Sequence, residues 1–305
     1  MPEPLKFYTY RRQFQCPKRV DRQFPKHVFY VQPQRIYHGF YPQFPLKRYQ
    51  SPRNSAFPGR KSDKSTIFVD LMVITPDILN RFDGSSIEDN LHYLIEVFGD
   101  EGVFSTSFGL EDQAITHLLS EARFPVSIFT LDTGRLFPET YSTWSSTLSR
   151  YGVNITAYYP KEADLQSWIS ENGPNAFYES VENRKSCCHI RKVEPLQRAL
   201  KGKKFWVTGI RAAQSPDRKG MPILEWDEVN GLIKYHPLLH WSDEQLKSFI
   251  AEHHIPYNPL HDKGFVSIGC APCTRAIREG EDFRAGRWWW EDNSKKECGL
   301  HVKTA

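Results

Sequence analysis

The fold of this chain is decided by the stretch Val103-Phe104-Ser105-Thr106-Ser107-Phe108-Gly109-Leu110-Glu111-Asp112. Its first half is strand-like, and a helical pattern follows over residues 113–122. A turn rich in serine and glycine joins the two. Because a strand that leads into a helix in this rhythm usually returns as a parallel strand, the stretch predicts a fold of the α/β class.

The same alternation continues on both sides of this stretch. Ser86-Ile87-Glu88-Asp89 predicts the start of a helix, with acidic residues that complement the helix dipole. The series as a whole predicts a single domain around a central, mostly parallel sheet. The downstream strand-like runs are 126–131, 154–159 and 205–210, and the helical runs are 138–150, 162–170 and from the cysteine pair at 187–188 to about residue 200.

Two local signals complete the prediction of the fold. Val229-Asn230-Gly231 lies between the strand-like runs 223–226 and 232–235 and predicts a hairpin. Ser242-Asp243-Glu244-Gln245 is a capping box, which predicts another helix start. No second domain boundary is evident before residue 260, and the remainder is rich in loops. We therefore expect one domain over 72–305 that ends in a mobile tail over 288–305.

Composition argues against a membrane protein. The chain has 305 residues, of which 39% are hydrophobic, and no apolar run approaches the roughly 20 residues that span a bilayer. No apolar leader precedes the body, so we expect a cytoplasmic protein. The net charge of +4 hides an asymmetry, because residues 1–70 hold 14 Lys and Arg against 4 Asp and Glu.

The basic first segment, residues 1–71, is rich in proline and aromatic residues and has neither helical nor strand periodicity. We expect it not to fold alone. Met72 precedes the first orderly pattern, so the native protein could begin there. A disordered tail is the alternative, and a transit peptide or a nucleic-acid-binding arm is less favoured.

The cysteines indicate a metal cluster and a separate reactive thiol. Cys187 and Cys188 are adjacent, Cys270 and Cys273 form a CxxC motif, and Cys298 stands alone near the C-terminus. Two adjacent sulfurs can hardly bind one tetrahedral ion, but each can reach a different iron of a four-iron, four-sulfur cube. A zinc site and a vicinal disulfide remain alternatives, the latter less favoured in a reducing compartment.

Three strand-to-helix turns at the carboxyl edge of the predicted sheet are candidates for binding an anionic nucleotide. Their glycines let backbone amides face a phosphate, and their hydroxyls add hydrogen bonds. The candidate residues are Ser105, Ser107, Phe108, Gly109 and Glu111 in the first turn, Asp132, Thr133, Gly134 and Arg135 in the second, and Gly209 and Arg211 in the third. Lys192, Arg284 and Arg287 would supply further positive charge.

With these motifs assembled, the chain from Met72 onward resembles the assimilatory adenylyl-sulfate reductases, the iron-sulfur branch of the phosphoadenylyl-sulfate reductase family. The resemblance rests on the conjunction of several motifs, of which the C-terminal one is the most specific. The matching stretches are Ser107-Phe108-Gly109-Leu110-Glu111-Asp112, Leu131-Asp132-Thr133-Gly134, Cys187-Cys188, Thr208-Gly209-Ile210-Arg211, Gly269-Cys270-Ala271-Pro272-Cys273 and Lys295-Lys296-Glu297-Cys298-Gly299-Leu300-His301.

The resemblance implies a fold of the PP-loop nucleotide-binding type and a redox enzyme of sulfate assimilation and cysteine biosynthesis. Adenosine 5′-phosphosulfate would be reduced to sulfite with release of AMP. Cys298 would be the nucleophile and carry an S-sulfonate, with His301 helping to lower its pKa. One [4Fe-4S] cluster would be held by Cys187, Cys188, Cys270 and Cys273. The electrons would come from a separate thioredoxin or glutaredoxin, and homo-oligomer formation is left open.

Three other functions compete with this one. Reduction of the 3′-phosphorylated nucleotide, alone or as a dual activity, is the nearest, although members restricted to it lack the four cluster cysteines. A PP-loop ATP pyrophosphatase would typically carry Ser-Gly-Gly-x-Asp-Ser, and Phe108 and Glu111 depart from that. A non-enzymatic iron-sulfur sensor would leave the motif around Cys298 unexplained.

Overall fold

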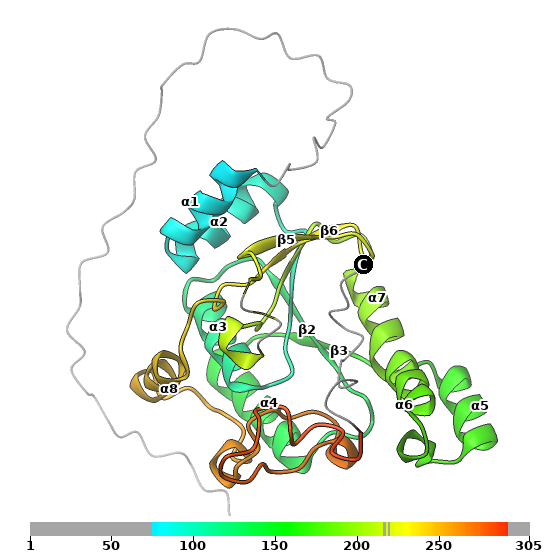
Figure 1. Cartoon of the computed structure of the whole chain (residues 1–305). Coiled ribbons are helices and arrows are strands. Elements are labelled where there is room, and N and C mark those ends of the chain that lie inside the picture. Colours follow the sequence, from blue (N-terminus) through cyan, green and yellow to red (C-terminus); the bar gives the residue numbers. More distant parts are fainter. Residues whose placement is uncertain (1–74, 216–217, 219, 292–305) are drawn as a thin grey trace, which may run out of the picture. The chain divides into compact units, whose positions relative to one another are not determined.

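A six-stranded sheet forms the centre of the fold (Figure 1). The computed structural model describes residues 75–215, 218 and 220–291, so the basic first segment lies outside the described residues. The strand order is β3-β2-β1-β4-β6-β5, and only β5 runs antiparallel to its neighbour. The predicted α/β class is confirmed. The strands are β1 Gly102–Ser105, β2 Ser127–Leu131, β3 Ile155–Tyr158, β4 Phe205–Val207, β5 Leu224–Asp227 and β6 Leu232–Tyr235.

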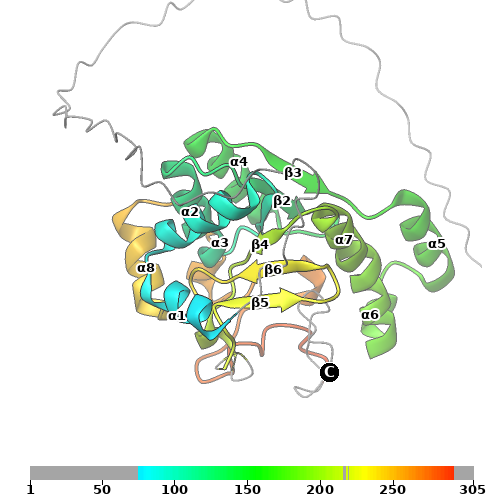
Figure 2. The ribbon, with the colours of Figure 1, turned by 90° about the horizontal axis from the view of Figure 1, so that it is seen from above.

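Helices lie on both sides of this sheet (Figure 2). One group gathers around the core that contains Phe104 and Phe205, and the other includes the helix that packs on β2 and β3. The first group is α1 Pro76–Gly84, α2 Ile87–Phe98, α3 Leu110–Glu121, α4 Pro138–Tyr151 and α8 Asp243–Glu252. The second is α5 Glu162–Asn172, α6 Val181–Cys188 and α7 Glu194–Leu200.

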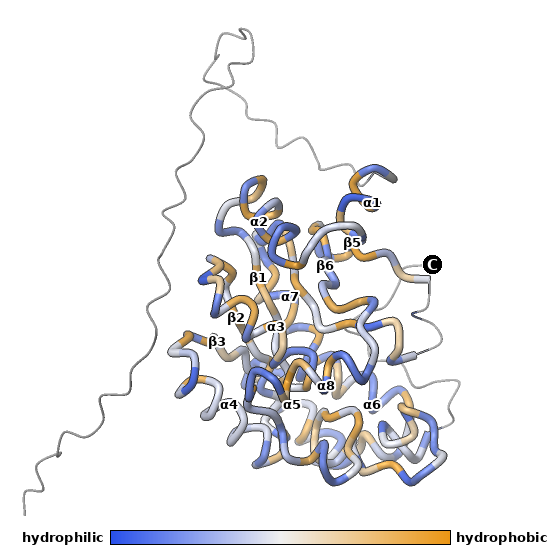
Figure 3. The backbone as a smooth tube through the Cα atoms, turned by 90° about the vertical axis from the view of Figure 1, so that its left-hand side faces the viewer, coloured by the Kyte–Doolittle hydropathy of each residue, from blue (hydrophilic) through white to orange (hydrophobic). Residues whose placement is uncertain are grey.

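Successive residues of the central strands fill two separate cores. Val103 packs with Trp206 and Leu200 on the side of α7, whereas Phe104 packs with Phe205 on the opposite face. This division follows from the alternation of side chains along a strand. Strand β1 is accordingly hydrophobic in Figure 3, as expected when a parallel sheet is covered on both sides.

The local signals for helix starts and for the hairpin are confirmed. Ser86 Oγ accepts a hydrogen bond of 3.0 Å from the Asp89 amide and caps α2. Ser242 and Gln245 form the reciprocal bonds of a capping box at α8, at 3.1 and 2.8 Å. Strands β5 and β6 pair antiparallel around Gly231, whose φ is +64°. The sequence thus located these elements through the hydrogen bonds that their end residues make.

The region of the cysteine pair differs from the prediction. Cys187 and Cys188 end helix α6 instead of preceding a helix, and a π-helical turn, His189–Val193, separates α6 from α7. Pro195 explains the change, because it has no amide hydrogen to donate to the carbonyl of Arg191. The Glu194 amide bonds to the carbonyl of His189 instead, five residues back. Such turns often occur at functional sites.

Candidate active site

A cavity of about 280 Å³ opens at the carboxyl edge of the sheet. We call it the edge cavity. Its wall combines the turns after β1, β2 and β4 with residues of the C-terminal segment. The predicted residues that line it are Ser105, Ser107, Gly109, Glu111, Thr133, Lys192, Gly209, Arg284 and Arg287. The structure therefore brings together residues that are up to 182 positions apart in the sequence, from Ser105 to Arg287.

The first turn is held in shape by Phe108, which does not line the edge cavity. Its φ is +61°, a left-handed conformation that is uncommon for a bulky residue. The Phe108 ring is buried and stacks on Trp144, with 5.4 Å between the ring centroids, and its amide donates to Thr106 Oγ1. Phe108 thereby anchors the turn so that Gly109, the cap residue of α3, faces the cavity. Backbone amides at such a helix start favour an anion.

Asp112, which lies at the start of helix α3, holds the loop after β1 in the same conformation. Its Oδ2 accepts hydrogen bonds of 2.6 Å from both the amide and the hydroxyl of Ser107. Burial nevertheless raises the pKa of Asp112 to about 6, because the loss of hydration outweighs these two bonds. Gly209 approaches Asp112 so closely that a Cβ at this position would lie 2.3 Å from Oδ1. Only glycine leaves room for this contact.

The raised pKa predicts how stability responds to pH. The unfolded carboxyl ionises with a pKa near 3.8 and the folded one with a pKa of about 6, so the unfolded state loses its proton first. The contribution of Asp112 to the free energy of unfolding should therefore fall as pH rises between these values. Asp112→Asn should abolish this fall, which urea denaturation of both proteins at pH 5 and pH 7 will measure. An equal pH response in the two proteins would contradict the prediction.

In the second turn, some residues hold the turn in shape and one lines the edge cavity. Asp132 Oδ1 accepts bonds from the Gly134 amide at 2.8 Å and from the Tyr141 hydroxyl at 2.9 Å. Arg135 bonds to the carbonyl of Pro174. Asp132, Gly134 and Arg135 do not line the edge cavity, whereas Thr133 does. The turn thus presents one hydroxyl to the cavity.

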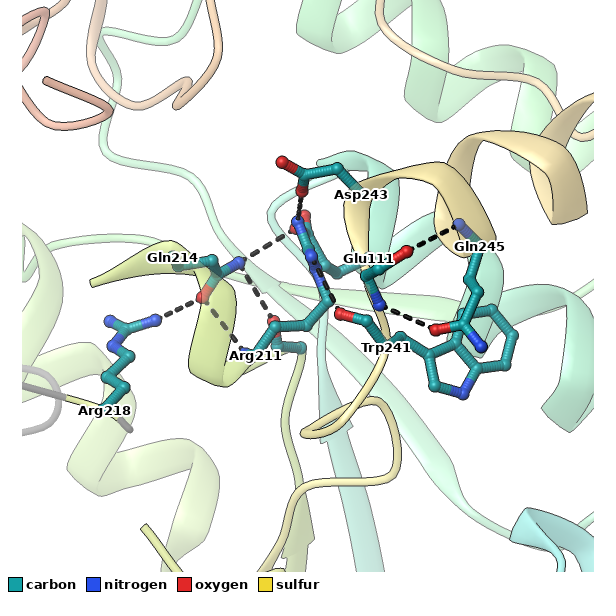
Figure 4. A network of polar contacts seen from close by, with 9 residues as sticks. Glu111, Arg211, Gln214, Arg218, Trp241, Asp243 and Gln245 are labelled. Carbon is teal, nitrogen blue, oxygen red and sulfur yellow. Dashed lines mark hydrogen bonds and ion pairs between the residues drawn. The ribbon is translucent and has the colours of Figure 1, made fainter. Parts of the chain in front are cut away.

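Arg211 does not line the edge cavity, although the sequence suggested that it binds an anion. Figure 4 shows the polar contacts that hold it. Its side chain is 2% exposed. The guanidinium donates to Glu111 Oε1 at 2.9 Å and to Asp243 Oδ1 at 2.5 Å. Gln214 Nε2 also donates to Glu111 Oε1, at 3.0 Å, and Arg218 donates to Gln214. Arg211 therefore orients Glu111, and its charge is already balanced by two carboxylates.

Removal of this buried charge should destabilise the fold. Arg211→Gln leaves the Glu111 carboxylate, which is 15% exposed, without its ion pair, and loss of the partner of a largely buried charge costs about 3 kcal/mol. Asp243 is 50% exposed and should add little to this loss. Arg198→Gln is the matched control, since Arg198 is 38% exposed and its pair with Glu194 should contribute less than about 1 kcal/mol. Chemical denaturation measures both values. Equal losses in the two variants would contradict the argument.

The edge cavity also contains residues that the sequence did not identify. Asp112, Thr208, Gln214, Arg218 and His261 line it. His261 is largely buried, its Nε2 has no hydrogen-bond partner among the described residues, and burial lowers its pKa. Asp112 and Thr208 lie within the motifs that predicted the site, so the sequence did carry a signal for them. Arg218 and His261 lie in stretches without a recognisable pattern.

A second cavity, which we call the cysteine cavity, is lined by Cys187, Cys188, Cys270 and Cys273. The four are free thiols, and all but Cys188 are buried. Burial raises the pKa of Cys187 and raises that of Cys273 to about 12. Burial also acts on Cys270, but the charge of Lys192 and a hydrogen bond with Thr133 lower its pKa below the usual range. Four basic side chains also line this cavity, namely Arg135, Arg184, Arg191 and Lys192.

The two cavities share a wall. Lys192, Cys270 and Trp288 line both of them. Thr133 Oγ1, which lines the edge cavity, lies 3.2 Å from Cys270 Sγ. Within the described ranges, no three Cys, His, Asp or Glu side chains are arranged to hold a single metal ion. Because the two cavities share these residues, a group bound by the four cysteines would lie directly beside a ligand of the edge cavity.

A family model supplies the decisive comparison. The model of the phosphoadenosine phosphosulfate reductase domain matches residues 101–276, more than half of the chain. The chain belongs to the phosphoadenosine phosphosulfate reductase family. The match contains the four cysteines of the cysteine cavity and the three turns of the edge cavity. Cys298 and His301 lie outside both the match and the described residues.

Several curated proteins that are similar to this reductase have a name more specific than that of the family. The proteins similar to the chain include several named adenosine 5′-phosphosulfate reductase, three of which follow. The one from Allochromatium vinosum is 52% identical over 202 residues, 66% of this chain and 79% of the relative. The one from Agrobacterium fabrum is 49% identical over 207 residues, 68% and 80% of the two chains. The one from a Sinorhizobium fredii strain is 46% identical over 226 residues, 74% and 90%.

A solved structure agrees with the family assignment. The phosphoadenylyl-sulfate reductase of Candida auris, crystallised as a phosphate complex, superposes on the reductase with a TM-score of 0.57 at 27% identity. The match covers 67% of this chain and 98% of that one. Among the described helices of the reductase, none is long and apolar enough to cross a membrane.

Proposed function

We propose that this reductase converts adenosine 5′-phosphosulfate to sulfite and AMP in sulfate assimilation. The observation that carries the proposal is the wall shared by a cavity suited to an anionic nucleotide and a cavity lined by four cysteines. The relatives at about 50% identity are named for this substrate, which supports the choice. Cysteine biosynthesis would consume the product.

The described residues suit the phosphate and sulfate groups of this substrate. Lys192, Arg284 and Arg287 line the edge cavity, and the amides at the start of α3 lie beside Gly109. Positive groups at this place would bind the phosphosulfate and stabilise the charge that AMP gains as it leaves. Arg211 is left out of this set because Glu111 and Asp243 hold it.

The four thiols that line the cysteine cavity are the donor set of a [4Fe-4S] cluster. A cube needs four thiolates, each on a different iron, and therefore does not need donors that converge on one ion. Cys187, Cys188, Cys270 and Cys273 would hold it, and Arg135, Arg191 and Lys192 would balance its negative charge. Arg184 is left out because Glu291 already neutralises it. When bound, the cluster would stabilise the surrounding fold and supply an electrostatic field to the neighbouring edge cavity, with no net transfer of electrons. The buried thiols would be kept as thiolates by the metal.

The proposed nucleophile is Cys298. Its thiolate attacks the sulfur of the sulfate group, the bond from that sulfur to the phosphate oxygen breaks, and AMP leaves with the electron pair. A thiolate of reduced thioredoxin or glutaredoxin then attacks Cys298 Sγ and displaces sulfite. The mixed disulfide is resolved by the second thiol of the partner, which is thereby oxidised by two electrons. His301 would favour the thiolate of Cys298.

The same proposal covers the organisation of the whole chain. The reductase domain would extend over 72–305, with the catalytic tail at 288–305, and residues 1–71 would be an extension that the reaction does not need. The expected mobility does not hold for the described part of that tail, 288–291, where Trp288 is 1% exposed and the Glu291 side chain 3%. Because the thiols must stay reduced, the cytoplasm is the expected compartment. A variant that lacks residues 1–71 and keeps full activity would support this division.

An assay of purified protein tests the function. Protein prepared without oxygen is analysed for iron and sulfide and then mixed with adenosine 5′-phosphosulfate and reduced thioredoxin. Sulfite formation is the expected result. The 3′-phosphorylated nucleotide is assayed in parallel, and equal rates would identify a dual enzyme. Absence of sulfite with both nucleotides would contradict the proposal.

A further inference from the structure

A threonine of the edge cavity is bonded to a fully buried histidine. Thr208 directly follows strand β4 and lines the edge cavity, and His236 directly follows the neighbouring strand β6. Strands β4 and β6 pair in parallel with Val207 opposite Tyr235, so the next residue of each strand stands beside the other on one face of the sheet. Thr208 Oγ1 lies 2.6 Å from His236 Nδ1, and the two residues are 2% and 0% exposed.

A carboxylate on the far side of the ring decides the direction of this hydrogen bond. His236 Nε2 lies 3.6 Å from Glu225 Oε1, and Glu225 also pairs with Lys234 Nζ at 3.4 Å. The distance of 3.6 Å is long for a hydrogen bond, yet a carboxylate favours a proton on the ring nitrogen that faces it. Burial lowers the pKa of His236, so the ring is neutral at pH 7 and carries only that proton. Nδ1 is therefore an acceptor, and the Thr208 hydroxyl donates to it.

This bond leaves the oxygen of Thr208 as an acceptor only. A hydroxyl has one proton and two lone pairs, and the proton is engaged by His236. Among the described residues, no amide or side chain donates to Thr208 Oγ1. A ligand of the edge cavity that brings a donor to this oxygen gains a hydrogen bond, whereas a ligand that brings another acceptor loses one.

The wall around Thr208 suits the nucleoside part of a nucleotide. The neighbouring lining residues on this face of the sheet belong to the core beneath helix α7 and are apolar, namely Leu131, Leu196 and Trp206. An apolar wall favours a base and a sugar, whereas a phosphosulfate favours the basic side chains of the same cavity. The phosphosulfate also carries acceptors only. The donors of adenosine are its two ribose hydroxyls and the 6-amino group of adenine.

We propose that Thr208 is a specificity-determining residue whose oxygen accepts a hydrogen bond from a donor of the nucleoside, a ribose hydroxyl or the adenine amino group. His236 sets the direction of this recognition because it keeps the Thr208 proton away from the ligand. The inference rests on the proposed function, in which the edge cavity binds an adenosine nucleotide. It adds a residue that selects the nucleoside to those that hold the phosphosulfate.

The test measures binding of four nucleotides to the full-length holoprotein. AMP carries all three donors and needs no reductant, so it is the reference. Three analogues each lack one donor: 2′-deoxy-AMP and 3′-deoxy-AMP lack one hydroxyl each, and IMP has a carbonyl in place of the amino group. Isothermal titration calorimetry gives the dissociation constant of each nucleotide for the unaltered protein and for the variants Thr208→Val and Thr208→Ser.

The variants separate recognition from stability. Thr208→Val keeps the shape of the side chain and removes the hydroxyl, whereas Thr208→Ser keeps the hydroxyl. Thr147→Val is the matched control, because Thr147 is 0% exposed and its Oγ1 accepts a bond of 2.8 Å from Gln113 Nε2. Thr147 does not line the edge cavity. This control therefore also loses a buried hydrogen bond, but one that does not face the nucleotide.

The unaltered protein should bind at least one analogue about 10-fold more weakly than AMP, the effect of one lost hydrogen bond. Thr208→Val should bind AMP about 10-fold more weakly and should not distinguish AMP from one such analogue, which thereby identifies the donor. Thr208→Ser and Thr147→Val should keep the preference.

Equal binding of all four nucleotides by the unaltered protein would overturn the inference, and this outcome depends on no variant. A preference that Thr208→Val retains in full would also overturn it, because the hydroxyl would then serve His236 alone. Failure of the unaltered protein to bind AMP would instead contradict the proposed function itself.

Discussion

Replacement of Cys298 by serine is expected to abolish sulfite formation. The proposed reaction needs a thiolate to attack the sulfate sulfur, and a serine hydroxyl is hardly ionised at neutral pH and cannot form the sulfur–sulfur bond that a reductant later breaks. A loss of at least about 1,000-fold in turnover is expected, since removal of a nucleophile leaves only the contribution of binding and charge stabilisation. Sulfite release in the presence of reduced thioredoxin measures the effect.

The controls for this variant are the properties of the cluster and of nucleotide binding, which Cys298 should not influence. Iron content, the visible absorbance of the cluster and the affinity for AMP should be those of the unaltered protein, because the four cysteines of the cysteine cavity and the lining of the edge cavity are untouched. Substantial residual turnover would refute the assignment of the nucleophile. Loss of iron together with activity would refute the separation between structural and reactive thiols.

Replacement of Cys270 by alanine is the second large effect that we expect. Cys270 lines both cavities, and its sulfur lies 3.2 Å from the hydroxyl of Thr133. Without it the cluster would have three thiolate ligands, so iron should fall from about four atoms per chain to less than one. Turnover should be lost at the same time. Iron analysis and the visible spectrum of protein purified without oxygen measure the outcome.

Two further variants show whether the loss is specific. Cys188→Ala tests the least buried of the four cysteines and should also lose iron, with less disturbance of packing. Cys16→Ala lies outside the matched family domain and should keep iron and activity unchanged. If Cys270→Ala retains four iron atoms and activity, the cysteine cavity does not hold the cluster.

The sequence predicted those features of the fold that depend on neighbouring residues. Ser86, Ser242 and Gly231 were informative because a cap or a tight turn involves residues only a few positions apart. Ends of strands were less certain, since β1 ends at Ser105 and β4 at Val207, earlier than their apolar runs. The apolar residues beyond these ends are buried in the turns, which hydropathy does not distinguish from a strand.

The sequence predicted which residues lie at the carboxyl edge of the sheet, but it did not predict which side chains contact one another there. Ser107, Gly109 and Thr133 line the edge cavity because parallel strands bring their carboxyl ends to one edge. Arg211 occupies the same edge, yet its charge is taken up by Glu111 and Asp243, which are 100 and 32 residues away. No local pattern reveals such a partner. The same holds for Arg184 and Glu291, 107 residues apart.

The π-helical turn at His189–Val193 limits how this protein should be engineered. Replacing Pro195 with alanine is an ordinary way to strengthen a helix, because alanine restores the missing donor and has the highest helical propensity. Here it would favour conventional winding through the turn. Each residue of altered winding rotates the following side chains by about 100°, which would turn Lys192 away from the boundary between the two cavities. Thermostabilisation campaigns should therefore leave this irregularity in place.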